Sequence, residues 1–244
     1  MTTAFRWVVS AYPAAPVATG GASDPFQVDE EVRPLPVDYA SLAALSERAL
    51  PVDADEAPDA VPVFIPAHVL AEAAAQAQAA GDVETGGVLV GKLRRDDGAP
   101  AGTSPALFVE VTAQVPARHT VATATRLTFT AETWAAVRAA IALRRGGELL
   151  LGWWHAHVDF CRVRGCPPER RALCTAADPF LSAEDLLLHA TMFGSAYQLA
   201  LLVRDSTARG QTCSLYGWSH GMVRRRGFHL VKGEIDAAHV PAGF

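Results

Sequence analysis

Hydrophobic and polar positions follow two different periods from about residue 61 onward. Apolar residues that recur every three or four positions predict helices, whereas apolar residues that alternate with polar ones predict half-buried strands. Pro66 and Gly81 bound one helical stretch, where proline favours a helix start and glycine a helix end, and Thr130 is placed to cap a second. The predicted helices are residues 66–81, 131–147 and 182–194, and the predicted strands are residues 84–93, 106–115, 148–158 and 196–205, followed by a hairpin over 212–231.

The order of these elements indicates the fold class. Helices and strands alternate, hairpins lie among them, and no segment repeats another. Such an order is typical of a single mixed sheet flanked by helices, which belongs to the α/β (α+β) class. Residues 148–158 form an apolar run, so we expect this strand to be central and buried. Trp153 and Trp154 would then pack on its two opposite faces.

The first 60 residues differ in composition from the rest of the chain. They are rich in Pro, Ala and Gly, and residues 51–60 are acidic and flanked by prolines. Such a composition makes regular packing difficult. We therefore predict an irregular, partly ordered N-terminal extension over residues 1–60, with one strand at 5–12 and one helix at 39–50. A single domain over residues 61–244 is expected to follow it.

The overall composition narrows the classes of function. With 50% hydrophobic and 19% charged residues, the chain can bury one large core. A net charge of -5 and a pI near 5.9 provide no basic field for nucleic acid or an anionic membrane. No apolar run approaches the roughly 18 residues of a membrane span, and the N-terminus is a poor signal peptide. We expect a cytoplasmic protein whose cysteines are reduced.

His155 and His157 occupy alternate positions near the end of the predicted central strand. Because side chains alternate between the faces of a strand, both imidazoles project to the same side, where both can reach one metal ion. The alternative is a pair of surface histidines on an exposed strand. The apolar run before them argues for a buried strand, in which imidazoles without partners are costly.

Ser182 and Asp185 open the third predicted helix. Their spacing is that of a capping box, in which the two residues satisfy the first backbone amides of a helix. A carboxylate in the first turn also points out beside the helix start, where an ion on an adjacent strand can take it as a third ligand. Asp178 is a rival for that role, although it precedes a proline and is expected in a loop.

Glu84 stands at the entry of a predicted buried strand, directly before a Gly-Gly pair that permits close backbone approach. Taken alone, it is simply a charged residue at a strand end. Taken with the Trp-Trp-His-x-His strand and the later Ser-x-x-Asp, this glutamate before "GGVLVG" resembles the signature of the JAMM (MPN-plus) zinc metalloproteases, in the same order. The resemblance covers residues 62–232 and extends to the bacterial, deubiquitinase-like members of that family.

The resemblance implies a fold and a role for each residue. The fold would be the JAB/MPN fold, a curved mixed sheet flanked by helices that is similar to cytidine deaminases. His155, His157 and Asp185 would bind Zn²⁺, which leaves an open position for an activated water. Glu84 would accept the proton of that water and deliver it to the leaving amine. Ser182 would donate a hydrogen bond to the oxyanion of the reacting carbonyl group.

Two features depart from the family pattern. Val158 replaces the proline that usually follows the second histidine, and 24 residues (158–181) separate His157 from Ser182 instead of a few. This insertion contains three of the four cysteines. Ordinary reduced thiols are one interpretation, since the spacing is not a standard zinc-finger pattern. The other is a second, structural zinc site formed by Cys161, Cys166 and Cys174, with Cys213 or a nearby histidine as the fourth ligand.

These motifs predict a zinc-dependent isopeptidase or peptidase that hydrolyses the bond after the C-terminal tail of a ubiquitin-like protein, in maturation or deconjugation. Its partners would be that protein and the activating and conjugating enzymes of the same pathway, with no nucleic acid and no membrane. One alternative is a hydrolase on the same scaffold that releases an amino acid or small adduct from a sulfur-carrier-like protein. Another is a non-catalytic MPN scaffold, which typically lacks the ligands present here.

Overall fold

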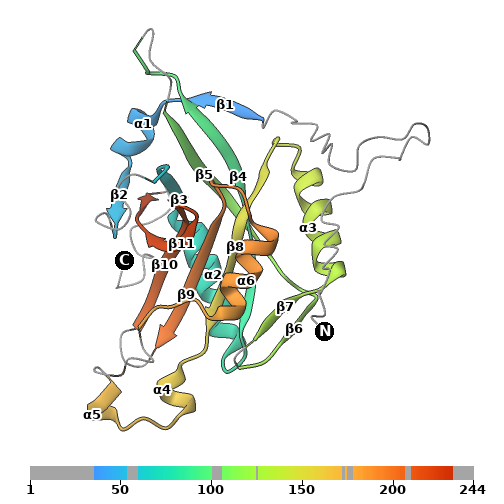
Figure 1. Ribbon diagram of the computed structural model, residues 1–244, viewed down its shortest axis with the longest axis vertical. Coiled ribbons are helices and arrows are strands. Elements are labelled where there is room, and N and C mark those ends of the chain that lie inside the picture. The colour runs from blue at the N-terminus through green and yellow to red at the C-terminus, as the bar shows by residue number, and fades with distance from the viewer. Residues whose placement is uncertain are drawn as a thin grey trace, which may run out of the picture.

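The computed structural model describes residues 36–53, 60–100, 106–124, 126–171, 174, 178–206 and 210–232. The predicted strand at residues 5–12 lies outside these ranges. Within them, ten strands form one curved mixed sheet and two further strands form a separate pair (Figure 1). The α+β class expected from the sequence is therefore confirmed.

The large sheet has the order β11-β10-β9-β8-β4-β5-β3-β12-β2, and β1 pairs with β4 beside this path. The long neighbours β4, β5 and β8 are antiparallel, whereas β8 and β9 are parallel. The ten strands are β1 (Val37–Ala40), β2 (Ala49–Val52), β3 (Val63–Pro66), β4 (Thr85–Asp96), β5 (Leu107–Pro116), β8 (Leu149–His157), β9 (Leu199–Ser206), β10 (Gly210–Ser219), β11 (Met222–Arg226) and β12 (Phe228–Val231). The separate pair is β6 (Thr120–Ala122) and β7 (Leu127–Phe129).

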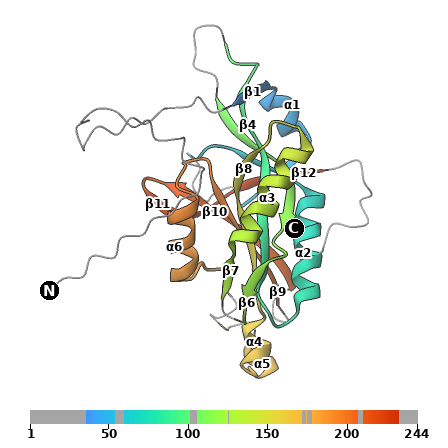
Figure 2. The ribbon, with the colours of Figure 1, turned by 90° about the vertical axis from the view of Figure 1, so that its right-hand side faces the viewer.

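Helices cover both faces of the sheet. Helix α2 lies on one face, and α3 and α6 lie on the other (Figure 2). The described helices are α1 (Leu42–Glu47), α2 (Ala67–Ala80), α3 (Ala131–Arg144), α4 (Phe160–Val163), α5 (Pro168–Arg171) and α6 (Ala183–Met192). No helix in the described ranges is long and apolar enough to cross a membrane.

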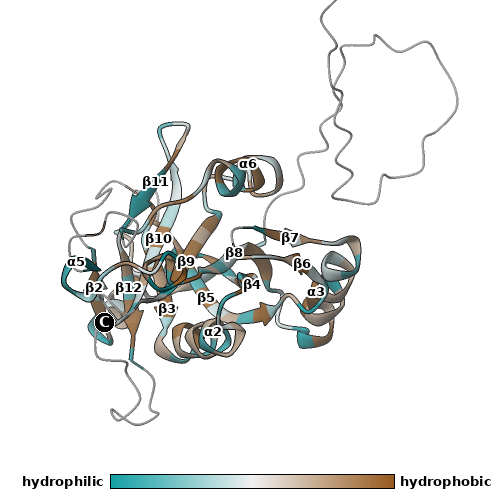
Figure 3. Ribbon diagram, turned by 90° about the horizontal axis from the view of Figure 1, so that it is seen from below, coloured by the Kyte–Doolittle hydropathy of each residue, from teal (hydrophilic) through white to brown (hydrophobic). Residues whose placement is uncertain are grey.

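Two tryptophans from the central strand β8 divide the core between the two faces, as predicted. Trp154 packs with Val69 and Leu70 of α2, on what we call the α2 face. Trp153 packs with Phe193, at the end of α6, on what we call the α6 face. Both indoles are fully buried. In Figure 3 the hydrophobic segments accordingly lie in the central strands between α2 and α6.

The helix boundaries follow from local chemistry. The Thr130 hydroxyl accepts a hydrogen bond from the amide of Thr133 at the start of α3, so the predicted cap is confirmed. Gly81 ends α2 with a φ of +67°, which is readily accessible only to glycine. Helix α1 is shorter than the predicted 39–50, because the chain on both sides of it enters the sheet as β1 and β2.

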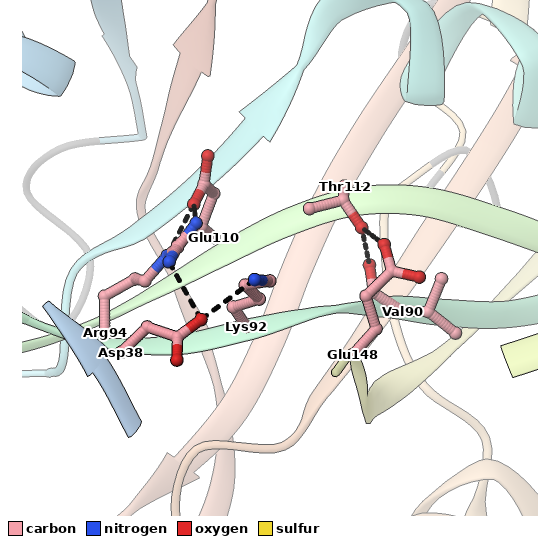
Figure 4. A network of polar contacts seen from close by, with 7 residues as sticks. All are labelled: Asp38, Val90, Lys92, Arg94, Glu110, Thr112 and Glu148. Atoms are coloured by element: carbon pink, nitrogen blue, oxygen red, sulfur yellow. Dashed lines mark hydrogen bonds and ion pairs between the residues drawn. The ribbon is translucent and has the colours of Figure 1, made fainter. Parts of the chain in front are cut away.

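The sheet begins earlier in the chain than the predicted boundary at residue 61. Strand β1 pairs in parallel with the end of β4, and β2 pairs with β12. Figure 4 shows how charges fix β1: Asp38 lies 2.8 Å from Nζ of Lys92 and 3.2 Å from a guanidinium nitrogen of Arg94. Arg94 also pairs with Glu110 of β5 at 2.7 Å. Residues 36–53 thus belong to the folded domain rather than to an extension.

The predicted C-terminal hairpin is only partly correct. Strands β10 and β11 form a hairpin, but β12 leaves it and pairs with β3 and β2 at the far end of the sheet. The change of partner occurs at Gly227, where a Cβ atom would lie 2.6 Å from the carbonyl oxygen of Asp53. Glycine is therefore needed for the two chain segments to pass so closely.

Candidate metal centre

The two histidines of β8 face each other on the α6 face of the sheet. His155 is completely buried and His157 nearly so. Their Nε2 atoms lie 3.0 Å apart. Strand alternation therefore brings the two imidazoles together as predicted, because Trp153, His155 and His157 share one face.

Asp185 of α6 completes a group of three ligand atoms. Its Oδ2 atom lies 3.4 Å from Nε2 of His155 and 3.5 Å from Nε2 of His157. The same carboxylate accepts a hydrogen bond from the amide of Ser182, and the Ser182 hydroxyl accepts one from the amide of Asp185. The capping box and the approach to the histidines are therefore both present. The rival Asp178 is exposed and is not part of the group.

The spacing of these three atoms fits a tetrahedral metal ion. Ligands bonded at about 2.0–2.1 Å to such an ion lie about 3.3–3.4 Å from one another. The observed separations are 3.0, 3.4 and 3.5 Å. Two imidazoles and one carboxylate leave one coordination position open, as in hydrolytic zinc sites. The residues present therefore fit a metal ion with an open coordination position, such as a catalytic zinc.

Charge and burial favour metal-binding protonation states in this group. Burial alone would raise the pKa of Asp185, but hydrogen bonds from His155 and His157 hold it well below its usual value. Burial lowers the pKa of His157, against the opposing effect of Asp185. An ionised carboxylate and a neutral imidazole are the forms that bind metal.

Aromatic rings enclose the two imidazoles. The Trp153 ring stacks on His155 with centroids 4.6 Å apart, and Phe180 lies 5.1 Å from His157. Phe160 approaches His157 from a third side at 5.8 Å. The Nδ1 atoms of both histidines are buried without a hydrogen-bond partner in the described part of the chain. Packing therefore orients these rings, rather than the hydrogen bonds that usually orient metal-binding histidines.

Glu84 approaches the centre from the neighbouring strand. It immediately precedes Thr85, which pairs with Ala156, so the same register continued by one residue sets Glu84 beside His157. The side chain is buried. Burial, followed by the charges of Asp185 and Glu184, raises its pKa to about 7. Glu84 is therefore close enough to the candidate ligands to respond to their charge, and it is poised to exchange a proton near neutral pH.

Glycine makes room between Glu84 and the ligands. Gly86 pairs directly with His155 across β4 and β8. A Cβ atom there would lie 2.4 Å from the carbonyl oxygen of Trp154 and 2.6 Å from a methyl group of Leu127. The backbone oxygen of Trp154 cannot move aside without shifting β8, so only glycine fits between β4 and β8 at this position.

The four cysteines lie in two different parts of the structure. The Sγ atoms of Cys161, Cys166 and Cys174 lie within 4.8 Å of one another. Cys213, which the sequence offered together with a nearby histidine as a candidate fourth ligand, is not part of this group. It lies on β10 opposite Val203, in the core on the α2 face, and its burial raises its pKa to about 12. The strand alternation of β10 turns this thiol away from the insertion.

Sequence reasoning missed Arg204 near the centre. This residue pairs with His157 between the parallel strands β8 and β9, so both side chains belong to the same face. It is buried, and its charge contributes to lowering the pKa of His157. The only signal in the sequence for a buried charge here was an arginine two residues after Leu202, within the apolar run "LALLVRD".

His189 of α6 packs behind Trp153, which stacks on His155. It is fully buried, and its Nδ1 atom accepts a hydrogen bond of 3.1 Å from the indole of Trp153. Its ring stacks on Phe193. His189 therefore supports the aromatic residue that packs on His155, without joining the ligand group itself.

A cavity of about 750 Å³ lies elsewhere on the molecule. Its lining includes Leu45 of α1, Phe64 of β3 and Val231 of β12, and none of the candidate ligands. The convergence of ligand atoms, rather than the presence of this cavity, identifies the candidate site, because a cavity without convergent reactive groups specifies no chemistry.

Comparison with known proteins adds little to this geometry. No protein-family model matches the sequence, and no curated protein matches it. Among solved structures, the chain is similar to the solution structure of protein DSY2949 from Desulfitobacterium hafniense, with a TM-score of 0.42 and 18% sequence identity. The similarity covers 72% of this chain and 97% of that chain. Any functional argument therefore rests on the residues of the site.

Proposed function

We propose that this protein is a zinc-dependent isopeptidase or peptidase of JAMM type, with a JAB/MPN fold, that hydrolyses the bond after the C-terminal tail of a ubiquitin-like protein. One observation carries the proposal. His155, His157 and Asp185 converge with the spacing of a tetrahedral ion, and the buried Glu84 lies beside them on the adjacent strand.

Zinc bound by these three residues would supply Lewis-acid activation of a water molecule. Glu84 is suited to the proton transfers. Its buried position raises its pKa to about 7, and a cation beside it would favour the ionised form that accepts a proton. The carboxylate takes a proton from the attacking water and then delivers it to the departing amine.

Ser182 is suited to stabilise the reacting carbonyl group. Its hydroxyl oxygen accepts a hydrogen bond of 3.1 Å from the amide of Asp185, which fixes the side chain at the start of α6. A hydroxyl that accepts one hydrogen bond retains its proton and can donate it. Donation to the developing oxyanion lowers the activation free energy by about 3 kcal/mol in comparable enzymes.

Exposed apolar side chains beside the ligands favour a protein substrate over a small molecule. Phe180, which packs on His157, is 41% exposed, and Leu187, two residues after Asp185, is 68% exposed. An exposed apolar side chain that packs on a reactive centre, as Phe180 does on His157, offers contact area to another protein. This observation supports a protein as the substrate, whichever group is released from its C-terminal tail.

The test uses the full chain loaded with zinc and a fusion of a ubiquitin-like protein to a C-terminal extension. We expect the wild-type protein to cleave the fusion after the tail. Glu84→Gln should retain zinc and lose about 10²–10⁴-fold in turnover, the usual contribution of a general base. Glu47→Gln, which alters an exposed carboxylate on α1, serves as the matched control and should retain activity.

Three results would count against the proposal. Full activity of Glu84→Gln would remove this residue from the mechanism. Zinc binding without cleavage of any fusion, together with release of an amino acid from a sulfur-carrier-like protein, would indicate the smaller substrate. A purified protein that binds no zinc at His155, His157 and Asp185 would instead indicate a scaffold.

A further inference from the structure

The insertion that follows His157 is not held together by a hydrophobic core. None of the described residues between Arg162 and Leu181 is buried. Its helices α4 and α5 contain four residues each, far fewer than the roughly 12–15 residues that an isolated helix needs to be stable. Figure 1 shows both helices extending beyond the end of the sheet. Something other than apolar burial must therefore stabilise this segment.

Three thiols converge inside the insertion. Cys161 follows the first residue of α4, and the chain then turns at Gly165, which has a φ of +64°. This turn lets the amide of Cys166 donate a hydrogen bond of 2.8 Å to the carbonyl of Cys161. Cys174 returns from α5, where its amide donates to the carbonyl of Arg171 at 3.1 Å. Two separate loops thus bring the third thiol to the first two.

The spacing and state of these thiols fit a single ion. None of the three forms a disulfide, and their Sγ atoms lie within 4.8 Å of one another. A tetrahedral zinc with Zn–S bonds of about 2.3 Å places its sulfur ligands about 3.8 Å apart. In the metal-free state, burial and then the two neighbouring thiols raise the pKa of Cys161 to about 11. A divalent cation removes that barrier, because it replaces the thiol protons on binding.

The surrounding charges match a thiolate-bound ion. Three thiolates and one Zn²⁺ carry a net charge of −1, which a basic environment stabilises. The insertion supplies four arginines, and one of them, Arg171, donates a hydrogen bond of 3.0 Å from its Nε to the carbonyl of Cys166. The other three are Arg162, Arg164 and Arg170.

We infer that Cys161, Cys166 and Cys174 bind one Zn²⁺ as a structural site that braces the insertion, separate from the centre at His155. Binding releases the thiol protons and forms three Zn–S bonds. No fourth histidine, cysteine or carboxylate joins the group in the described ranges, so a water molecule would complete the coordination.

The insertion that this zinc site would stabilise contacts the surroundings of the candidate catalytic residues at two points. Phe160, next to Cys161, packs on His157. Arg162 forms an ion pair with Asp82, two residues before Glu84. Fixing the insertion therefore restrains both strands that carry the other centre. This inference does not depend on the proposed hydrolytic activity.

The test measures zinc per chain in the full-length protein by plasma mass spectrometry. We expect two ions in the wild type, one in Cys166→Ser/Cys174→Ser and two in the control Cys213→Ser. The variant His157→Ala should retain one ion, which assigns the remaining site to the cysteines. A single ion that survives the double cysteine substitution and is lost in His157→Ala would overturn the inference.

A second measurement remains informative if the cysteine variants do not fold. Cobalt substituted into the wild type and into His157→Ala should show thiolate-to-metal charge-transfer absorption, because sulfur ligands remain in both. Absence of that absorption would contradict a thiolate site. Detection by mass spectrometry of a disulfide between any two of the three cysteines in the native protein would contradict it as well.

Discussion

Ser182 and Asp185 hold each other in a reciprocal pair at the start of α6. The Ser182 amide donates to the Asp185 carboxylate at 2.7 Å, and the Asp185 amide donates to the Ser182 hydroxyl at 3.1 Å. The same carboxylate oxygen lies 3.4 Å from His155. The Asp185 side chain therefore caps the start of α6 and also faces the strand histidines, so the capping and ligand interpretations of the sequence do not exclude each other.

This dual role predicts different outcomes for two substitutions of Asp185. Asp185→Asn retains an acceptor for the Ser182 amide but loses the charge, whereas Asp185→Ala loses both. We expect both variants to lose zinc affinity by more than the roughly 10–100-fold that removal of an outer hydrogen-bond partner costs. Asp185→Ala should lose about 1 kcal/mol more in unfolding free energy, because the cap is also gone.

The measurements are chelator competition for zinc affinity and urea unfolding of the metal-stripped proteins. Glu184→Gln, which changes an exposed carboxylate in the same turn, is the control and should bind zinc like the wild type. Wild-type affinity in Asp185→Asn would exclude this carboxylate from the metal centre.

The sequence predicted the elements whose signals are local. The alternation of β8 placed His155 and His157 on one face, and the Ser-x-x-Asp spacing placed Asp185 in the first turn of α6. These patterns depend only on the geometry of one strand or one helix turn. The candidate ligand group of His155, His157 and Asp185 could therefore be assembled from two short segments.

The sequence did not predict features that depend on distant partners. Strand β1 is held in place by its pairing with β4 and by the ion pairs of Asp38. The two cationic partners of Asp38 lie more than fifty positions further along the sequence. No pattern in the sequence separates Cys213 from the three cysteines of the insertion. The register of β10 against β9 turns Cys213 to the α2 face. The place of Arg204 beside His157 likewise follows from strand register, which residue patterns alone do not specify.

Gly86 is predicted to be essential for the shape of the metal centre. A Cβ atom at this position would lie 2.4 Å from the backbone oxygen of Trp154 and 3.3 Å from the Cα of His155, so Gly86→Ala must displace β8. We expect a loss of about 1–3 kcal/mol in unfolding free energy, together with weaker zinc binding. Chemical denaturation and chelator competition measure these two effects.

Gly98→Ala provides the matched control for Gly86→Ala. The nearest atom to a Cβ at Gly98 is a carboxylate oxygen of Asp96, at an ordinary contact distance of 3.5 Å. This variant should stay within about 0.5 kcal/mol of the wild type. Equal effects of the two substitutions would show that the close packing at Gly86 is unimportant.

Trp153 and Trp154 should differ in their effect on metal binding although both are fully buried. Each replacement by leucine is expected to cost about 2–4 kcal/mol in unfolding free energy, through lost packing. Only Trp153→Leu removes the ring that stacks on His155, so it alone should lower zinc affinity, by about 10–100-fold. Trp154→Leu, on the α2 face, is the control. Equal zinc affinities in the two variants would contradict this division between the faces.

The buried His189 should make the protein less stable in mild acid. Its burial lowers its pKa from 6.5 to about 4. The Nδ1 atom accepts the hydrogen bond from the indole N–H of Trp153. A proton added to Nδ1 would therefore point directly at the indole hydrogen. Because the unfolded chain binds a proton on this residue below pH 6.5 and the folded chain does not, stability falls as pH decreases from 6.5 towards 4.

The expected loss from His189 between pH 7 and pH 5 is on the order of 2 kcal/mol in unfolding free energy. His189→Gln keeps an acceptor for the Trp153 indole and cannot titrate, so its stability should fall less over the same interval, by about that amount. Urea unfolding of both metal-stripped proteins at the two pH values provides the comparison, since metal ligands then contribute equally. Parallel losses in the two proteins would show that His189 takes up its proton as readily in the folded state as in the unfolded chain.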